Sequence, residues 1–382
     1  GCIKMDAFYK ELYVVYFRKW LFNQQNKTCI VYNDPQNQDT VILEEKNCLC
    51  KITFNLHSII EFTIINKKTN KAECYLHFQM QNLNHACKIF YEMFENMSQI
   101  TNIPAKKILL TCSGGLTTGY FVEKLNSKIK TDDSFYYELL CTVIKNPKRY
   151  VGIFRVTNVK TKLIQNVTQS REIKLGDFME DIVTDYIHAM GYTNLNKHIG
   201  TDTEGNQLNA DQVFRKDNTI YLIEQKIRDD HDSTKKRGQY DNFRKKYTLL
   251  KTQYPDCTIN ATMWFIDDSF AKNKRYYLTK ASQESSNNVT LNILYGGALF
   301  DTIFKRNDVW EEICEYLGKH KQERNDEILH IPDFDTSPEM LNALKQLKIN
   351  DHNLYRKLMS DKPLYVQLRK ELFPTGTNLN LV

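Results

Sequence analysis

Long apolar runs are missing from this 382-residue chain, and glycine, proline and paired cysteines are sparse. No stretch approaches the ~18 consecutive apolar residues of a membrane-spanning helix, so no membrane partner is expected. Only 14 glycines and 8 prolines occur, too few for a collagen-like or low-complexity chain. With 41% hydrophobic and 26% charged residues, the composition indicates a folded chain of two or three domains.

The ten cysteines lack the regular spacing of a disulfide framework. Cys48 and Cys50 form one close pair, but no second Cys or His pair stands at a suitable distance. Two ordinary buried or half-buried thiols are therefore expected there in preference to a zinc site. Because no secretory signal is visible either, we expect reduced thiols and a cytoplasmic protein.

Basic and acidic residues nearly balance, with a formal net charge of +6. Residues 1–130 contain 16 Lys and Arg against 11 Asp and Glu, whereas residues 131–382 contain 36 against 35. The positive excess thus lies mostly in the first third of the chain. Net charge alone is weak support for a nucleic-acid partner.

The first 130 residues are predicted to form a small α+β module. Apolar periodicity predicts helices over Phe8–Leu21 and Leu83–Met97, and alternation predicts strands at Lys51–Leu56 and Glu61–Ile65. A change of pattern near residue 130 marks the expected boundary. Nothing in this module indicates a particular chemistry, apart from the turn described next.

A glycine-rich turn follows the predicted strand Ile108–Leu110 and precedes a helix that begins near Tyr120. Backbone N–H groups in such a turn can bind an anion, and Cys112 there would have a lowered pKa and could act as a nucleophile. Residues 106–126 resemble the phosphocysteine loop of sugar phosphotransferase IIB components, although the alternating strands and helices of such a domain do not follow. A strand-to-helix turn with an unreactive thiol is the alternative.

A helix and a strand are predicted first after residue 131, and from the helix Gly176–Met190 onward the elements follow the order helix, three strands, helix, strand. The expected elements are helix Phe135–Val143, strand Tyr150–Thr157, helix Gly176–Met190, extended Thr193–Ile199, strands Leu208–Phe214 and Thr219–Ile227, helix Ser233–Thr252 and strand Ile259–Ile266. Four more helices are expected at Asp308–Lys319, Ser337–Lys348, Asn353–Ser360 and Leu364–Leu372.

The central strand pair brings acidic residues close to a lysine. Glu224 follows Asp211 by thirteen residues, and the two-residue period of a strand places Glu224 and Lys226 on one face. Two carboxylates from adjacent strands can hold a divalent cation, and a lysine beside them can orient or deprotonate a water. A surface charge pair on an ordinary hairpin is the alternative. The apolar strand before Glu224 favours a buried, functional site.

This arrangement resembles the PD-(D/E)XK nuclease superfamily, and residues 131–382 resemble one family of type II restriction endonucleases. The resemblance rests on Ile223–Gln239, on Tyr150–Arg155 and Lys162–Gln165 upstream, and on Leu372–Gly376 near the end. Ala210 departs from the motif, which has proline there, but that position binds nothing.

The resemblance implies an α/β core of a central mixed sheet flanked by helices, in a chain that is α+β overall. Residues 1–130 would form the N-terminal module, residues 131–310 the nuclease core and residues 311–382 a helical extension packed on that core. The implied activity is Mg²⁺-dependent, sequence-specific cleavage of double-stranded DNA that leaves 5′-phosphate and 3′-hydroxyl ends. A palindromic target would imply a homodimer.

Carried over residue by residue, Asp211 and Glu224 would bind Mg²⁺ and Lys226 would activate the water. Glu180 on the preceding helix could supply a third carboxylate, and Gln239 could approach the phosphate; a solvated helix residue and a surface glutamine are the alternatives. A basic cluster beside the site is expected to contact DNA phosphates, although a solvated helix face is the usual meaning of such a run. Its members are Arg228, Lys235, Lys236, Arg237, Arg244, Lys245 and Lys246. The acids around His231 are expected to order their loop or to contact bases.

Two other functions remain open at this stage. One is a defence nuclease with the same core, gated by a ligand that binds the N-terminal module near Ser113–Gly119. The other is a non-catalytic, sugar-responsive DNA-binding or regulatory protein organised around Cys112. Loss of Mg²⁺-dependent cleavage on replacing Asp211 would distinguish an enzyme from a binding protein.

Overall fold

The computed structural model describes residues 14–25, 27, 29–55, 59–79, 86–87, 90, 108–111, 115–116, 118–129, 133–323 and 331–382. The chain divides into two compact units. Residues 1–123 and 180–316 form unit 1, and residues 124–179 and 317–382 form unit 2. The three-module division expected from the sequence stays a prediction. Within the described residues, no helix combines the length and apolarity that crossing a membrane requires.

A five-stranded mixed sheet forms the centre of unit 1, in the order β13-β12-β11-β10-β7. Its strands are β7 (Thr193–Asn194), β10 (Gln212–Lys216), β11 (Thr219–Lys226), β12 (Thr258–Phe265) and β13 (Val289–Tyr295). The strand pairs β7–β10 and β10–β11 are antiparallel, while β11, β12 and β13 run parallel. A short separate ribbon pairs β8 (His198–Thr201) with β9 (Gln207–Asn209).

The predicted hairpin is present as β10–β11, but the predicted strand Leu208–Phe214 is divided: its first residues belong to β9, which pairs with β8, and β10 begins at Gln212. The hairpin turn contains Asp217 with a positive φ of 51°, a conformation that Asp and Asn adopt more readily than most residues. Apolar and polar residues alternate little along strand β11, because both of its faces are covered. Ile220, Leu222 and Ile223 are all buried. The expected central apolar strand is confirmed.

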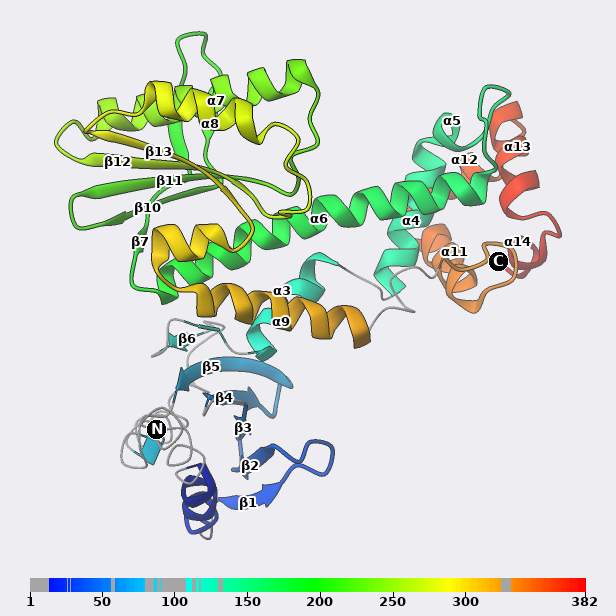
Figure 1. Cartoon of the computed structure of the whole chain (residues 1–382). Coiled ribbons are helices and arrows are strands. Elements are labelled where there is room, and N and C mark those ends of the chain that lie inside the picture. Colours follow the sequence, from blue (N-terminus) through cyan, green and yellow to red (C-terminus); the bar gives the residue numbers. More distant parts are fainter. Residues whose placement is uncertain are drawn as a thin grey trace. The chain divides into compact units, whose positions relative to one another are not determined.

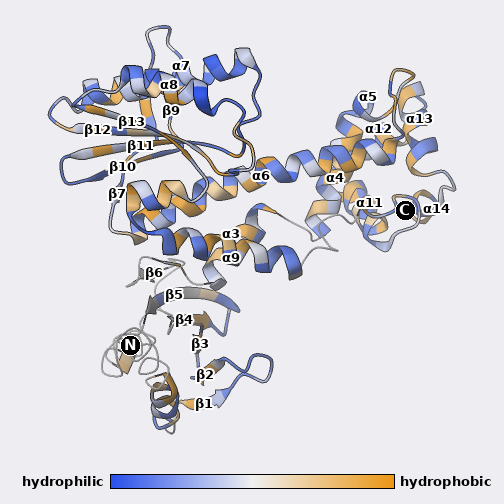
Figure 2. Ribbon diagram, viewed as in Figure 1, coloured by the Kyte–Doolittle hydropathy of each residue, from blue (hydrophilic) through white to orange (hydrophobic). Residues whose placement is uncertain are grey.

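Helices cover both faces of this sheet, as Figure 1 shows. Helix α7 (Ser233–Gln253) and helix α8 (Lys274–Glu284) lie over one face, and the last turns of α6 (Val159–Ala189) lie over the other. Each parallel crossover contains one of these helices, as parallel strands require. Figure 2 shows that α7 is largely hydrophilic on the outside, while its buried face carries Tyr240, Phe243 and Leu250. The predicted mixed sheet flanked by helices is therefore confirmed.

Two parts of this region differ from the sequence prediction. Helix α8 and strand β13 form a second parallel crossover that the pattern analysis missed. The predicted strand Tyr150–Thr157 is wrong, since Tyr150 ends helix α5 (Pro147–Tyr150) and the next residues form an irregular loop. Gly152 there has a φ of +146°, and Ile153 is 92% exposed. Val151 still packs into the core, but Ile153, Phe154 and Val156 have no described strand to pair with and remain in solvent.

The N-terminal part of unit 1 contains a six-stranded sheet in sequence order. Its strands are β1 (Ile30–Asn33), β2 (Thr40–Glu44), β3 (Cys48–Phe54), β4 (Ile59–Asn66), β5 (Lys71–Gln79) and β6 (Ile108–Thr111). Residues 14–22 are helical and pack on it through Phe17 and Leu21. Cys48 and Cys50 point into this core, as expected for buried thiols. Most of the predicted helix Leu83–Met97 lies outside the described residues.

Buried polar contacts connect this sheet to helix α9 (Asn307–Glu323) within unit 1. The Tyr316 hydroxyl donates to Glu61 Oε1 at 3.2 Å, and His77 Nε2 lies 2.9 Å from Glu312 Oε1. Burial raises the pKa of Glu61, although hydrogen bonds from Thr118 and Tyr316 oppose this effect. Unit 1 therefore shares one buried polar network between its N-terminal sheet and α9. A five-residue π-helix, η2 (Phe300–Phe304), precedes α9.

Unit 2 is helical. Helix α4 (Asp133–Lys145), helix α5 and the first turns of α6 pack against α11 (Pro338–Asn350), α12 (His352–Leu358) and α13 (Pro363–Leu372), and α14 (Thr377–Leu381) ends the chain. Helix α3 (Thr118–Lys128) enters this unit from unit 1. Ser337 caps α11 by accepting a hydrogen bond from Met340 N, with Pro338 in the first turn, as the sequence predicts.

Candidate active site

The hairpin register brings the two predicted carboxylates together. Gln212, the first residue of β10, is paired with Ile223 on β11. Asp211, which directly precedes β10, therefore stands opposite Glu224, near the carboxyl end of β11. Helix α7 covers the face on which Glu224 and Lys226 lie, and the opposite face carries Gln225.

Reciprocal hydrogen bonds fix both side chains. The Asp211 backbone N–H donates to Glu224 Oε2 at 3.1 Å, and the Gln225 backbone N–H donates to Asp211 Oδ2 at 2.7 Å. Each carboxylate thus binds the backbone of the other strand and is held in a defined orientation. The two acids are therefore next to each other and held in place, and their remaining oxygen lone pairs are ones that could bind a cation.

Glu224 is the most constrained group of the site. It is 3% exposed, and its Oε1 accepts a hydrogen bond from Lys246 Nζ on α7. Burial and the nearby Asp211 charge raise the pKa of Glu224 to about 7, and the Lys246 ammonium opposes that rise. A buried carboxylate next to a second carboxylate is costly unless positive charge accompanies it.

Lys246 is the residue whose role the sequence analysis missed. The sequence predicts a DNA contact for Lys246, but the residue is only 6% exposed and its ammonium contacts Glu224. The sequence does contain a signal for its burial. Lys246 has the helical spacing from Phe243 and Leu250 that places all three residues on the buried face of α7. A lysine within a buried apolar stripe requires a partner, and Glu224 supplies it.

The other predicted site residues have identifiable neighbours. Lys226 lies two residues beyond Glu224 on β11 and is half-buried. The Glu180 carboxylate binds Lys197 Nζ at 2.8 Å, while its backbone carbonyl accepts from Gln212 Nε2. Gln239 Nε2 contacts the His231 ring at 3.0 Å. The structure therefore joins Asp211, Glu224 and Lys246 by direct contacts and gives Glu180 and Gln239 different partners.

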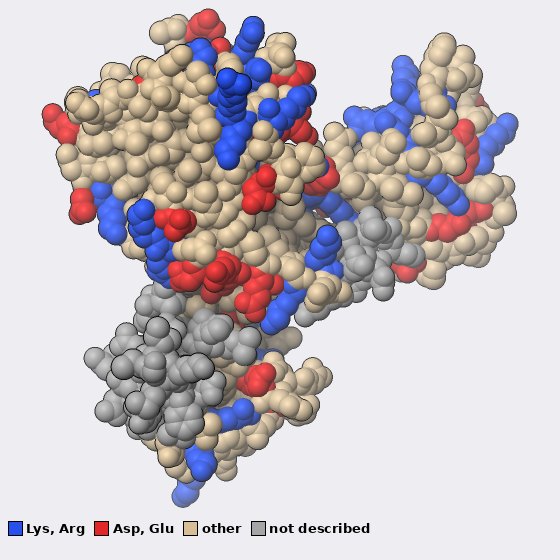
Figure 3. Space-filling view, in the orientation of Figure 1, with Lys and Arg blue, Asp and Glu red and all other residues tan. Residues whose placement is uncertain are grey.

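The remaining basic residues differ in whether their side chains are exposed or already held by acidic or aromatic neighbours. Lys235 and Arg237 are exposed, and Lys236 stacks on the Tyr276 ring. In contrast, Arg244 is held by Glu284 and Asp241, and Lys245 lies 3.4 Å from Asp202. Figure 3 shows Lys and Arg gathered over α7 and α8, and Asp and Glu gathered over α9. Arg228, the last member of the set, stacks on Phe270.

The acidic loop after β11 is ordered by its own side chains, one of the two roles expected for it. Asp229 is fully buried, and its Oδ2 accepts from the Tyr295 hydroxyl at 2.7 Å and from Asn273 N at 2.8 Å. Asp232 caps α7 by accepting from Thr234 N and Lys235 N. These bonds fix the start of α7, the helix that places Lys246.

Replacing Asp229 by Ala should lower the free energy of unfolding by about 3 kcal/mol, because the Tyr295 hydroxyl and Asn273 amides would lose their buried acceptor. Urea unfolding measures this change. The neighbouring Asp230→Ala is the matched control, since the Asp230 side chain is 58% exposed and should contribute within about 0.5 kcal/mol. Equal losses for the two variants would contradict the role given to Asp229.

The donor set suits a divalent metal ion such as Mg²⁺. Oxygen ligands are the ones that Mg²⁺ prefers, and a cation between Asp211 and Glu224 would relieve the repulsion that raises the pKa of Glu224. Across the described part of the chain, no three His, Cys, Asp or Glu side chains are grouped as a ready-made metal site. The two carboxylates would therefore need water or substrate oxygens to complete the coordination, as is usual for Mg²⁺.

The glycine-rich turn of the N-terminal part binds the chain's own carboxylates. Leu116 N donates to Glu312 Oε2 at 3.1 Å, and Thr118 N donates to Glu61 Oε1 at 3.0 Å. The expected anion-binding amides are thus present, but these two already have acceptors within unit 1. Cys112 lies outside the described residues, and the resemblance to the phosphocysteine loop is not confirmed.

Comparison with known proteins gives one positive result. No curated protein and no solved structure matches the chain. A family model matches residues 193–321, a segment that contains β7 to β13, the Asp211–Glu224 pair, Lys226 and Lys246. That model describes HinfI, a family of type II restriction endonucleases, so about a third of the chain is similar to a restriction endonuclease.

Proposed function

We propose that this protein is a type II restriction endonuclease with a PD-(D/E)XK core that hydrolyses double-stranded DNA to 5′-phosphate and 3′-hydroxyl ends. The observation that supports this most is the Asp211–Glu224 pair. Reciprocal hydrogen bonds to the backbone hold both carboxylates, with Lys226 one pleat away, inside the segment similar to HinfI. Action on DNA in the cell also favours a cytoplasmic location.

The residues have separate tasks in this mechanism. Asp211 and Glu224 would hold Mg²⁺, which when bound supplies charge stabilisation at the scissile phosphate and makes a nearby water more acidic. Lys226 would orient that water for in-line attack and stabilise its conjugate base. Lys246 would balance the Glu224 charge before the ion arrives.

The exposed basic residues of α7 would position the DNA. Lys235 and Arg237 are exposed in the first turns of the helix that covers the site, so they can contact backbone phosphates. Arg244 and Lys245 would first have to leave their acidic partners. A palindromic recognition sequence would further imply that two copies act together.

The test is to digest a phage genome with the purified chain in millimolar Mg²⁺ and then to sequence the fragment ends. Discrete fragments with 5′-phosphate ends at one recurring sequence are expected, and excess chelator should prevent their formation. Intact DNA across a series of genomes, with Mg²⁺ or Mn²⁺ present, would contradict the proposal and favour a non-catalytic DNA-binding protein.

The pH dependence of the metal requirement gives a second test. The pKa of Glu224 is raised to about 7, so the proton competes with the ion below that pH. The Mg²⁺ concentration for half-maximal cleavage should therefore rise as pH falls below 7, by up to about tenfold per unit. Titrations at pH 6, 7 and 8 measure it. Equal half-maximal concentrations at pH 6 and pH 8 would remove Glu224 from the set of ligands.

A further inference from the structure

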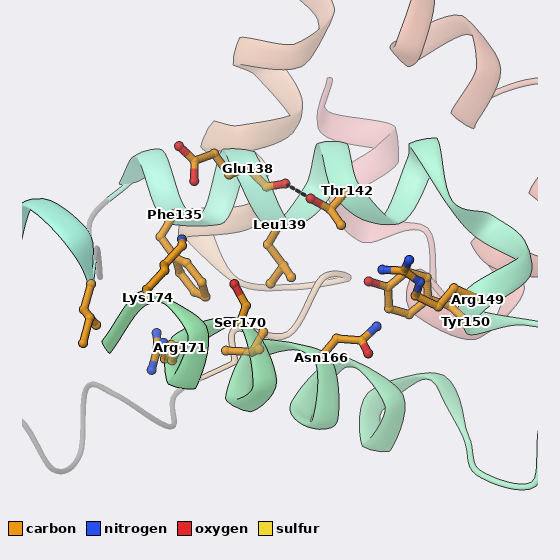
Figure 4. A pocket seen from close by; sticks show the side chains of 12 residues that line it. Phe135, Glu138, Leu139, Thr142, Arg149, Tyr150, Asn166, Ser170, Arg171 and Lys174 are labelled. Carbon is orange, nitrogen blue, oxygen red and sulfur yellow. Dashed lines mark hydrogen bonds between the residues drawn. The ribbon is translucent and has the colours of Figure 1, made fainter. Parts of the chain in front are cut away.

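A cavity in unit 2, far along the sequence from the residues discussed above, is lined by basic side chains. It has a volume of about 220 Å³ and lies between α4, α5 and the first half of α6. Figure 4 shows Asn166, Ser170, Arg171 and Lys174 from α6 on one side of it. Phe135 comes from α4 on the other side, and Arg149 and Tyr150 come from α5 at one end.

Arg171 is the unusual member of this lining. Its side chain is only 9% exposed, and no described residue accepts a hydrogen bond from its buried Nε and Nη1. Its guanidinium lies 4.9 Å from the centre of the Phe135 ring, which supplies a flat support but no acceptor. Burial lowers the pKa of Arg171, and the hydroxyl of Tyr136 only partly opposes this.

A second buried donor lies in the same cavity. Asn166 Nδ2 has no acceptor among the described residues. Buried donors without acceptors are rare in folded proteins, and each usually marks a bound water, ion or ligand. Both residues come from α6 and both line this cavity. Arg171 and Asn166 thus each present a buried N–H donor that lacks a hydrogen-bond acceptor among the described residues.

The charges around the cavity favour an anion. Arg149, Arg171 and Lys174 contribute three positive charges to the lining, and Glu138 is its one acid. Figure 4 shows the Glu138 side chain directed away from α6. The volume is below the ~300–1,000 Å³ of drug-sized ligand sites, which indicates a small group.

We propose that this cavity binds a phosphate group, with Arg171 as the principal donor beside Phe135, and with Lys174, Asn166 and Arg149 as the other donors that line the cavity. A guanidinium presents parallel N–H groups that match two phosphate oxygens, and a planar ring beneath it fixes its orientation. The phosphate belongs either to a small phosphorylated molecule or to the backbone of DNA.

The test measures the melting temperature of the full chain as sodium phosphate replaces sodium chloride at constant ionic strength. The wild type should gain about 3–6 °C at phosphate tenfold above its Kd, and the gain should saturate. Arg171→Met should lose the gain, and should melt no lower than the wild type without phosphate. An arginine with a merely structural role would instead give a lower melting temperature and an unchanged phosphate effect.

Two further variants keep the result interpretable. Arg149→Gln changes an exposed residue of the same cavity, so it tests the site even if Arg171→Met does not fold. Lys162→Gln removes the same charge from α6 outside the cavity and is the control. Phosphate also stabilises proteins generally by exclusion from their surface. Equal gains in all four proteins would therefore overturn the proposal, as would no gain in the wild type.

Two other probes distinguish a small phosphorylated molecule from a DNA phosphate. They are AMP and a DNA duplex, the latter with chelator present so that it is not cleaved. If Arg171→Met weakens duplex binding several-fold and free phosphate competes with the duplex, the cavity takes a DNA phosphate. If duplex binding is unchanged while AMP stabilises the wild type but not Arg171→Met, the ligand is a small phosphorylated molecule. Fluorescence anisotropy measures the first and melting temperature the second.

Discussion

Replacing Asp211 by Asn should reduce Mg²⁺-dependent DNA cleavage by about 10²–10³-fold, the loss typical of removing one electrostatic contact at a reacting centre. The asparagine oxygen can still accept the Gln225 N–H that Asp211 Oδ2 accepts at 2.7 Å. The hairpin should therefore keep its shape, while the negative charge that binds the ion is gone. Rates of plasmid nicking and linearisation under single-turnover conditions measure the loss.

Asp217→Asn is the matched control for this experiment. Asp217 lies in the turn of the same hairpin, and its positive φ of 51° is one that asparagine also tolerates. This variant should cleave at the wild-type rate. If Asp211→Asn cleaves within tenfold of Asp217→Asn, with both melting as the wild type does, then Asp211 does not bind the ion and the proposed site is wrong.

The second large effect concerns stability. Lys246→Met should lower the free energy of unfolding by about 1–2 kcal/mol more at pH 8 than at pH 5, because at pH 8 it leaves the buried Glu224 carboxylate without its cation. The loss should shrink towards pH 5. The fold already raises the pKa of Glu224 above 4.5, and removing the Lys246 charge raises it further, so at low pH the group is neutral in both proteins. Urea unfolding at the two pH values measures this.

Two companion variants separate the ion pair from simple packing. Lys245→Met changes the adjacent residue, whose side chain is 49% exposed, and should alter stability by no more than about 0.5 kcal/mol. The double variant Glu224→Gln with Lys246→Met replaces both charges by neutral groups of similar size. It should recover most of the stability lost by Lys246→Met alone. A pH-independent loss that the double variant does not recover would assign Lys246 a packing role only.

Local patterns predicted the hairpin and the site's position within it. The apolar strand ending in Glu224 and Lys226, and the turn before it, depend on residues that are close in sequence. The register between β10 and β11 then places Asp211 opposite Glu224 without any long-range contact. Such features are visible in a single sequence because their causes are local.

The missed features depend on contacts between distant segments. Lys246 looks like its exposed neighbours Lys245 and Arg244 until α7 is laid over β11, and only then is it buried. The predicted strand at Tyr150–Thr157 has suitable apolar residues but no strand to pair with. The Arg171 cavity forms between α4, α5 and α6, and no pattern along one helix shows it.

The arrangement of the hairpin and α7 also sets an order of folding for the site. The β10–β11 turn is short, so this hairpin can form on the microsecond timescale, and it already places Asp211 beside Glu224. The parallel pairing of β11 with β12 requires the whole of α7 between them, which is a slower step because the closing loop is long. Lys246 arrives on that helix. The step that removes Glu224 from water is therefore the same step that brings its counter-charge, and the nascent chain never has to bury the carboxylate alone.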